Sequence, residues 1–330
     1  MATSMRRWLR IAGLVVVLVL GVSAGLAFWA LRAKMPDEPR LPGRIEHGSL
    51  EHGGRSRTWI MYLPATMQPH PAIVIALHGS MGTSAQARQV YGYDFDLLAE
   101  THGLLAVYPQ GYQGHWNDSR VKGPFAAKIE NVDDVGFLHA LVDRLAKDHG
   151  ADPAHVYVTG VSNGGQMTLR LALQTPDFAR AYAVVVSSVP AAGNLAVTPS
   201  RKPVSILFMN GTRDPFNPWN GGDVALYGVW GNRGAALSTQ ASIDSFLELD
   251  GLAGIAPATT QIPDADLTDG STAERRRWTA PGKRSVTLIS IVGGGHGVPH
   301  PATHGRPLLG NSNRDFHAAN EIWDFFRQAP

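Results

Sequence analysis

Residues 156 to 165, Val-Tyr-Val-Thr-Gly-Val-Ser-Asn-Gly-Gly, decide the fold class of this chain. The β-branched residues of this stretch predict a strand, residues 166–173 predict a helix, and Gly-Val-Ser-Asn-Gly at 160–164 forms the turn between them. In such a turn the serine adopts a strained backbone that exposes its hydroxyl above the sheet, and the flanking glycines remove Cβ atoms that would clash. We therefore predict that Ser162 is a nucleophile, the alternative being a serine that only caps the helix.

Two later loops carry the residues that a serine nucleophile needs. Asp214 lies a few positions past the predicted strand 204–209, where a carboxylate can orient a histidine. His296 lies in the glycine-rich loop 293–297 after a late predicted strand, and a neutral imidazole is a suitable base for a hydroxyl near pH 7. The order Ser162, Asp214, His296 is that of the α/β-hydrolase arrangement and differs from the trypsin-like and subtilisin-like orders.

A glycine-rich loop after an earlier strand predicts the oxyanion hole. The apolar run 72–77 has the composition of a strand buried on both faces, and it ends in His-Gly-Ser-Met-Gly at 78–82. Backbone N–H groups in such a loop can point at a developing oxyanion. We assign the N–H groups of Ser80 and Asn163 to this role. We expect His78 to be structural and not the catalytic base.

Three aromatic residues lie on loops that leave the sheet near the predicted triad. Trp116 ends a loop rich in glycine and aromatic residues at 109–117, and Phe216 and Trp219 follow Asp214. We predict that these three side chains line a substrate cleft. The alternative is that they are ordinary packing aromatics of the loops.

Composition excludes several other classes of function. The hydrophobic fraction of 44% and charged fraction of 17% suit one large core, and the net charge of +2 comes from scattered Lys and Arg, which argues against nucleic-acid binding. The absence of cysteine excludes thiolate nucleophiles and cysteine-ligated zinc. Asp133 and Asp134 resemble a metal pair, but capping of a following helix explains them more simply. We expect no cofactor and no metal.

The first 44 residues predict a membrane or export segment. A short basic tail at 1–10 precedes residues 11–31, which contain no charged residue and are long enough to cross a bilayer. This run is either a transmembrane signal anchor or a cleaved signal peptide, and its length and Trp29 favour the anchor. Residues 32–44 form a proline-rich linker.

Residues 45–330 are expected to form a single catalytic domain. Its fold class is α/β, with a mostly parallel central sheet flanked by helices and an antiparallel pair of strands at its start. The N-terminal hydrophobic helix precedes it. We also expect one helix at about 87–102 and a final amphipathic helix at 316–327.

Taken together, these motifs resemble the extracellular polyhydroxybutyrate depolymerase and feruloyl esterase family, a carbohydrate esterase family 1-like group of the α/β-hydrolase fold that lies close to the acetylxylan esterases. The resemblance covers about residues 45 to 327. It rests on short motifs that occur in the same order, namely Leu77-His78-Gly79-Ser80, Tyr108-Pro109-Gln110-Gly111, Trp116-Asn117, Val132-Asp133-Asp134-Val135-Gly136-Phe137, Gly160-Val161-Ser162-Asn163-Gly164-Gly165, Asn210-Gly211-Thr212-Arg213-Asp214 and Gly293-Gly294-Gly295-His296.

The resemblance implies an exported serine carboxylic ester hydrolase, similar to a polyhydroxybutyrate depolymerase, that acts on hydroxyacid oligomers. A feruloyl or acetylxylan esterase acting on plant-wall esters is the first alternative. An acyltransferase of the same fold and a non-catalytic binding protein on a hydrolase scaffold are the others. The expected location is the extracellular or periplasmic face, secreted or tethered through residues 11–31 if these are not cleaved.

Overall fold

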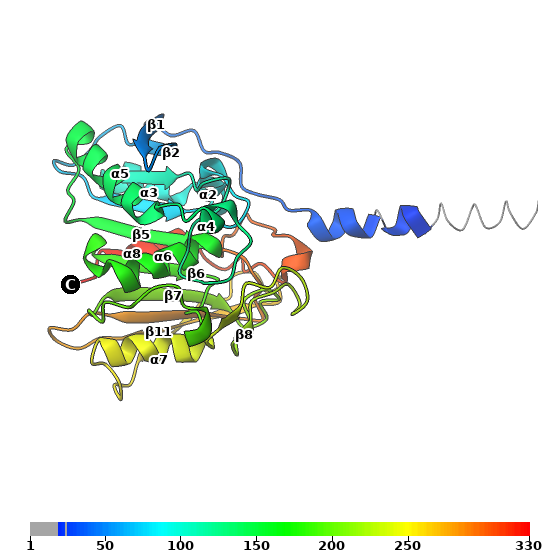
Figure 1. The fold of residues 1–330 in the computed structure, drawn as a ribbon. Helices are drawn as coiled ribbons and strands as arrows, with labels where there is room; N and C mark the ends of the chain where they lie inside the picture. The colour runs from blue at the N-terminus through cyan, green and yellow to red at the C-terminus, as the bar shows by residue number, and fades with distance from the viewer. Residues whose placement is uncertain (1–18, 24) are drawn as a thin grey trace, which may run out of the picture.

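The computed structural model describes residues 19–23 and 25–330, in which helices cover both faces of a large mixed sheet (Figure 1). The strand order of this sheet is β1-β2-β4-β3-β5-β6-β7-β12-β11-β10. These strands are β1 (Arg44–His52), β2 (Arg55–Leu63), β3 (Ile73–Leu77), β4 (Leu105–Pro109), β5 (Val156–Val161), β6 (Ala181–Val185), β7 (Ser205–Gly211), β10 (Ala258–Ile262), β11 (Thr272–Trp278) and β12 (Val286–Val292). A separate ribbon pairs β8 (Gly222–Asp223) with β9 (Ala235–Ala236). The helices are α2 (Ser84–Val90), α3 (Asp94–His102), α4 (Ala126–Ile129), α5 (Asp134–His149), α6 (Asn163–Gln174), α7 (Thr239–Leu249) and α8 (Ala318–Phe326), with 3-10 turns η1 (Pro176–Phe178), η2 (Ala192–Asn194) and η3 (Pro307–Leu309).

The centre of the sheet is parallel and its edges are antiparallel. Strands β4, β3, β5, β6, β7 and β12 run in one direction, whereas β1 and β2 at one edge and β11 and β10 at the other pair antiparallel. Every residue of β3, β6 and β7 is buried, as continuous apolar runs in a sheet covered on both faces require. The predicted α/β fold with a mostly parallel sheet and an antiparallel start is confirmed.

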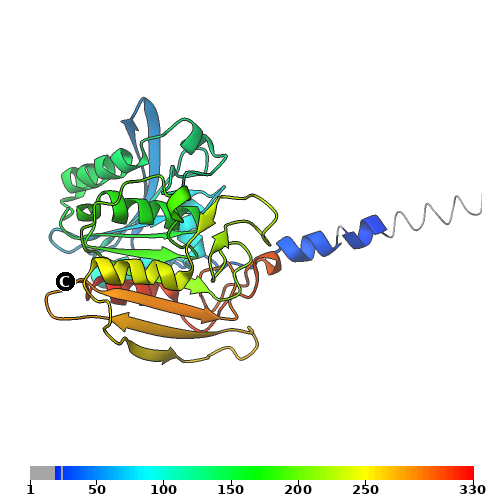
Figure 2. The ribbon, with the colours of Figure 1, turned by 60° about the horizontal axis from the view of Figure 1, so that its bottom comes forward.

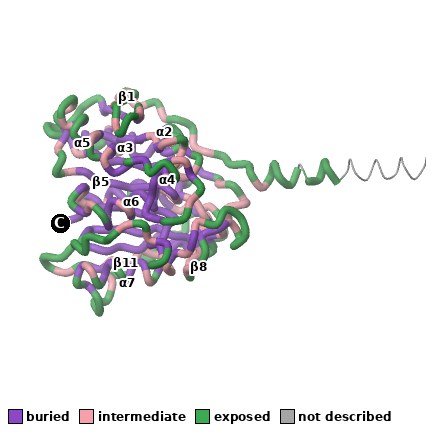
Figure 3. The backbone as a smooth tube through the Cα atoms, viewed as in Figure 1, coloured by how far each residue is buried: buried purple, intermediate pink, exposed green. Residues whose placement is uncertain are grey.

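Side chains of each central strand alternate between two hydrophobic layers. In β3, Ile73, Ile75 and Leu77 pack with helices α5, α6 and α7, whereas Val74 and Ala76 pack with α2, α3 and α8. Figure 2 shows α7, drawn in yellow, lying across the first of these faces. The backbone in Figure 3 is accordingly purple through the strands and green at the outer loops. The sheet is therefore a rigid platform whose strand ends can hold loops in fixed positions.

The helix predicted at about 87–102 is two helices. The helix α2 begins with a capping box between Thr83 and Gln86, and the chain then turns through Gly92 and Tyr93, whose φ angles are 67° and 64°. A left-handed backbone at two successive residues cannot continue a right-handed helix. The prediction of a single helix was wrong because Tyr93 is not a residue type that signals this conformation.

The described part of the N-terminal segment extends away from the sheet. Residues 19–23 and 25–31 are helical, and the helix projects from the rest of the molecule in Figures 1 and 2. Within residues 19–23 and 25–330, no helix combines the length and the apolar character that a bilayer span requires. The predicted tail 1–10 and residues 11–18 and 24 of the predicted anchor lie outside the described residues.

The carboxyl group of Asp250, at the end of α7, is buried and changes its protonation state near neutral pH. Asp250 is 2% exposed, and its Oδ1 accepts a hydrogen bond of 3.0 Å from the N–H of Val204. Its Oδ2 has no hydrogen-bond partner among the described residues. Burial raises the pKa of Asp250 to about 7, and the bond from Val204 only partly offsets this rise.

We expect Asp250→Asn to stabilise the protein at alkaline pH. Because the pKa of Asp250 in the folded state lies above its unfolded value of about 3.9, the native state favours the protonated acid. That stabilisation is present below about pH 4 and is lost as pH rises through 7. Asparagine stays neutral and keeps an oxygen for Val204. The melting temperature of the variant minus that of the wild type should grow by roughly 5 °C between pH 4 and pH 8. Asp244→Asn on the exposed side of α7 is the control, and a pH-independent difference would contradict this account.

Candidate active site

The turn between β5 and α6 holds Ser162 in a strained backbone conformation. Its φ is 56° and its ψ is −113°, outside the regions that L-residues ordinarily occupy. The Ser162 N–H donates to the carbonyl of Val185 at 2.9 Å, and its own carbonyl accepts from the hydroxyl of Ser187 at 2.8 Å. The neighbouring strand β6 and the residues that follow it therefore stabilise the strained residue from both sides, as strain at functional residues requires.

The glycines on either side of Ser162 are needed because backbone approaches them closely. A Cβ on Gly160 would lie 2.3 Å from the carbonyl oxygen of Gly164. A Cβ on Gly164 would lie 2.3 Å from the carbonyl oxygen of Leu77 and 2.6 Å from that of His78. Such distances are below any van der Waals contact, so the turn packs directly against the end of β3.

Asp214 and His296 are joined by a hydrogen bond. The Nδ1 of His296 lies 2.7 Å from Oδ2 of Asp214. The other carboxylate oxygen accepts the backbone N–H groups of Phe216 at 2.7 Å and Asn217 at 2.8 Å. Only 1% of the Asp214 side chain and 11% of the His296 side chain are exposed. The carboxylate is thus fixed in orientation, and it holds the proton of His296 on Nδ1 and leaves Nε2 as the basic nitrogen.

The sheet brings Ser162, Asp214 and His296 to the same edge. Each follows the carboxyl end of a parallel strand, respectively β5, β7 and β12, and these strands lie close together in the order β5-β6-β7-β12. Carboxyl ends of parallel strands share one edge of a sheet, which is where ligand sites form in open α/β folds. The three predicted triad residues therefore share the edge on which a nucleophile, a base and an orienting acid would have to meet.

The predicted oxyanion loop lies against the serine turn. A Cβ on Gly79 would be 3.7 Å from the Cβ of Ser162, so the two backbones are neighbours. Neither the N–H of Ser80 nor that of Asn163 has an acceptor among the residues that the structure describes. Both N–H groups are free to donate to a negatively charged oxygen.

His78 holds this loop in place. Its Nδ1 lies 2.7 Å from the carbonyl oxygen of Gly79, and its Nε2 accepts the N–H of Gly111 at 2.9 Å. Burial lowers the pKa of His78 to about 4, so the ring is neutral at pH 7. Both ring nitrogens are occupied by backbone groups, which agrees with the structural role predicted for this residue.

The structure places Trp116 beneath the oxyanion loop and not in a cleft. The side chain has no exposed surface, its indole N–H donates to the carbonyl of His78 at 3.0 Å, and its ring centroid lies 5.0 Å from that of His78. A substrate cannot reach a side chain in this position. The prediction that Trp116 contacts substrate is therefore corrected to a packing role.

The other two predicted aromatic contacts lie on the loop of the triad acid. The ring of Phe216 is half-buried, and its centroid lies 5.4 Å from that of His296. Trp219 is half-buried and packs against the hydrophobic layer that contains α7. Phe216 is thus beside the candidate base, whereas Trp219 contributes to the support of the loop.

Asp118 is a residue of the site that sequence reasoning missed. Its Oδ2 accepts the side-chain N–H of Asn163 at 2.6 Å, while the Oδ1 of Asn163 accepts the backbone N–H of Trp116 at 2.9 Å. Burial would raise the pKa of Asp118, but Arg120 and Lys128 outweigh it and hold the pKa below the usual value. This anchored amide fixes the residue after the nucleophile. The sequence carries no local signal for this role, because Asp118 and Asn163 are 45 positions apart in the chain.

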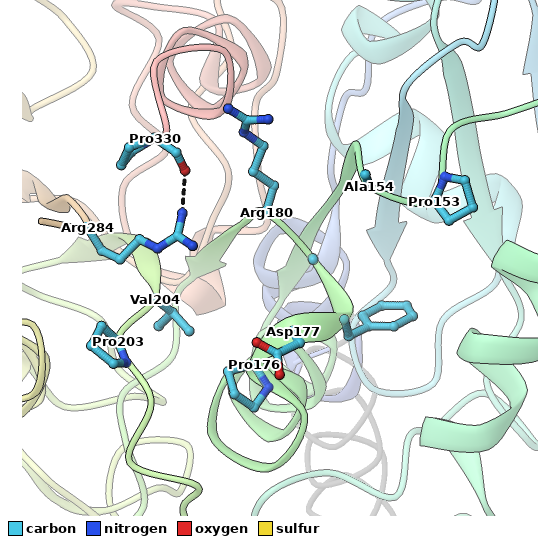
Figure 4. A pocket seen from close by; sticks show the side chains of 11 residues that line it. Pro153, Ala154, Pro176, Asp177, Arg180, Pro203, Val204, Arg284 and Pro330 are labelled. Atoms are coloured by element: carbon cyan, nitrogen blue, oxygen red, sulfur yellow. Dashed lines mark hydrogen bonds between the residues drawn. The ribbon is translucent and has the colours of Figure 1, made fainter. Parts of the chain in front are cut away.

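Two cavities lie at opposite edges of the sheet. The one beside the candidate triad has a volume of about 410 Å³ and is lined by Ser80 and His296, although Ser162 is not among its lining residues. The other, of about 360 Å³, is shown in Figure 4 and is lined by residues that precede strands, among them Arg180 before β6 and Arg284 before β12. Because the amino ends of these parallel strands lie opposite the triad, the second cavity takes no part in its chemistry.

Hydrogen bonds account for the cluster of Asp94, His300 and His317, whose possible ligand atoms lie within 4.8 Å of one another. The Nδ1 of His300 accepts the backbone N–H of Ala302 at 3.1 Å, so Nε2 of its neutral ring carries the proton and faces Asp94 at 3.6 Å. His317 pairs with Asp94 at 2.9 Å, and this hydrogen bond raises the pKa of His317. These contacts account for the three side chains without a metal ion.

No protein-family model matches the chain. The sequence is 28% identical over 284 residues to a protein of Nocardia uniformis subsp. tsuyamanensis named as esterase NocK, covering 82% of this chain and 79% of that protein. It is 27% identical over 256 residues to poly(3-hydroxyalkanoate) depolymerase C of Paucimonas lemoignei, covering 72% of this chain and 58% of the relative. Acetylxylan esterase A of Aspergillus oryzae is 31% identical over 132 residues, 40% of this chain and 41% of that protein.

Among solved structures, the chain is similar to an acetyl xylan esterase from Aspergillus awamori, with a TM-score of 0.52 and 18% identity over 90% of this chain and 99% of that one. This similarity shows the shared α/β-hydrolase fold. The chain spans less than two thirds of the length of the depolymerase and of the Aspergillus oryzae esterase. The relatives and the fold confirm the predicted resemblance to esterases of this group and the prediction of an ester-hydrolysing enzyme.

We expect Gly164→Ala to damage both stability and activity. The new Cβ would overlap the carbonyl oxygens of Leu77 and His78, forcing apart the serine turn and the oxyanion loop. The melting temperature should fall by about 5 °C or more, and kcat of the folded fraction should fall with it. Gly193→Ala in η2 is the matched control. A Cβ at this position would meet no atom within 4 Å apart from those of the adjacent residues in the chain. Equal melting temperatures for the two variants would contradict the crowding argument.

Proposed function

We propose that the chain hydrolyses carboxylic esters through Ser162, His296 and Asp214. The observation that carries the proposal is the bond between Asp214 and His296 at the sheet edge that also carries the strained serine turn. An orienting acid, a base with its Nε2 free and a serine in this conformation form the set that acyl transfer to water requires.

The proposed reaction has two halves. His296 Nε2 takes the proton of the Ser162 hydroxyl while Ser162 Oγ attacks the carbonyl carbon of the ester. The N–H groups of Ser80 and Asn163 donate hydrogen bonds to the resulting oxyanion. The C–O bond to the alcohol then breaks, and the imidazolium gives its proton to the leaving oxygen. Water, deprotonated by His296, then attacks the acyl carbon of the acyl-enzyme. The bond from this carbon to Ser162 Oγ breaks, the imidazolium returns its proton to Ser162, and the acid leaves.

As substrate we propose esters of hydroxyacids, in particular soluble hydroxybutyrate oligomers. The similarity to the Paucimonas depolymerase over 72% of this chain supports this choice. The similarity to an acetylxylan esterase over 40% of the chain favours acetylated or feruloylated plant-wall polysaccharides as the second candidate. The relation to esterases makes an acyltransferase or a non-catalytic binding protein the weaker interpretation.

We also propose that the catalytic domain is exported to the extracellular or periplasmic side. Support comes from the sequence alone, in the uncharged run 11–31 after a basic tail. The run would tether the domain to the membrane if it is kept and would release it if it is cleaved.

We expect Asp214→Asn to lower kcat for p-nitrophenyl butyrate by about 10⁴-fold with little change in melting temperature. The amide oxygen can still accept the N–H groups of Phe216 and Asn217, but the amide nitrogen cannot accept from His296 and selects the wrong tautomer. Ser162→Ala should abolish turnover in the same assay. Asp223→Asn, which removes an exposed carboxylate of the same region, is the control. Wild-type turnover in a folded Asp214→Asn protein would disprove the assignment.

A substrate panel separates the two candidate substrates. We expect the full chain to cleave hydroxybutyrate oligomers with a higher kcat/KM than methyl ferulate or acetylated xylan, with Ser162→Ala giving the background rate. Release of acid is followed by titration at constant pH. Preference for ferulate or acetylated xylan would transfer the enzyme to the plant-wall class.

A further inference from the structure

Residues 33–38, which lie before β1, are attached to the catalytic domain through Lys34 and Glu38. Lys34 and His304 form an antiparallel bridge, in which each N–H donates to the other's carbonyl at 2.8 and 2.9 Å. Glu38 pairs with Arg88 of α2 at 2.6 Å, and Arg88 in turn pairs with the buried Asp96 at 2.6 Å. We call residues 33–38 the strap. Its two ends are held by different elements, the loop that follows His296 and the helix α2.

The strap forms part of the cavity beside the candidate base. Ala33 and Met35 line this cavity together with Ser80 and His296. In an extended chain, residues two apart lie on the same face, so the bridge at Lys34 turns both neighbours toward the cavity. The strap is therefore a wall of the cavity and not only a connection to the preceding helix.

The lining residues indicate which half of an ester this cavity would hold. The carbon under attack must lie at Ser162, whereas the leaving oxygen must lie at His296, which returns the proton to it. The cavity is lined by His296 and not by Ser162. It is thus on the side of the leaving alcohol. Its other walls combine polar side chains, among them Gln86, Gln89 and Arg306, with apolar ones, which suits an alcohol that carries further ester or hydroxyl groups.

We propose that the strap closes an alcohol subsite and that Met35 determines which alcohols fit it. The proposal rests on the ester hydrolase function proposed above and adds a specificity-determining residue outside the triad and its loops. It makes the segment before the sheet a part of the enzyme's substrate selection.

The docking of the strap can be tested without catalysis. The chain contains no cysteine, so the double variant Lys34→Cys/His304→Cys introduces a single possible disulfide. Residues facing each other in a hydrogen-bonded antiparallel pair have Cα atoms about 5.5 Å apart, within the range of a disulfide. In the full chain we expect mild oxidation to consume both thiols, with a mass loss of two hydrogens. Each single variant keeps one reactive thiol as control. Two persistently free thiols in the double variant would overturn the docking.

The specificity role is tested with two esters that share an acetyl group and differ in the alcohol, ethyl acetate and methyl 3-acetoxybutyrate. The release of acetate is measured, because the second compound also carries a methyl ester. Met35→Ala should change the ratio of their kcat/KM values by about tenfold, mainly through KM for the larger ester, because it removes a wall of the alcohol subsite. Met67→Ala, the same change on the exposed segment before β3, is the matched control.

The outcomes separate this inference from the proposed function. If the wild type cleaves both esters and Met35→Ala gives the same ratio as Met67→Ala, the alcohol subsite is wrong while the hydrolase function stands. If a folded wild type cleaves neither ester, the proposed function fails and the subsite fails with it. A changed ratio for Met35→Ala alone supports the inference.

Discussion

The left-handed backbone at Ser162 constrains the arrangement of everything around it. Its φ of 56° is tolerated because β6 binds its N–H and Ser187 binds its carbonyl. The backbone also approaches Gly160 and Gly164 so closely that neither position has room for a side chain. Strain of this kind costs about 1–3 kcal/mol, and it persists where surrounding structure determines it fully. The turn, the oxyanion loop and the adjacent strand must therefore form together, and none of them can shift without releasing the others.

A layer of buried polar groups transmits this constraint to the loops. His78 binds one backbone group of its own loop and one of the loop at Gly111, Trp116 donates to the carbonyl of His78, and Asn163 is anchored by Asp118. In a dry interior each of these bonds is strong, and each group would be costly to leave unpaired. The free N–H groups at Ser80 and Asn163 are thus directed by a network that solvent does not reach. Preorganisation of this kind lets donors stabilise developing charge without first having to move.

Much of this could be predicted from the sequence because the signals are local. Short patterns predict the strand, turn and helix around Ser162, the apolar runs that form the central parallel strands, and the order of the three candidate triad residues. The structure has the predicted fold, and the three residues follow strands that end at one edge of the sheet. Trp116 was misplaced because loop residues near a site carry no mark that separates burial from exposure. The break at Tyr93, the anchoring role of Asp118 and the pairing of Lys34 with His304 depend on contacts between segments far apart in the chain, which no local pattern encodes.

The bridge between Lys34 and His304 has a consequence for how the molecule matures. The two residues are separated by about 270 positions, so during synthesis the first leaves the ribosome long before the second exists. The Lys34 end of the strap can dock only after the loop that follows β12 has formed, whereas the Glu38 end needs only α2. The part of the cavity wall that depends on this bridge is therefore completed late, after most of the chain has been synthesised.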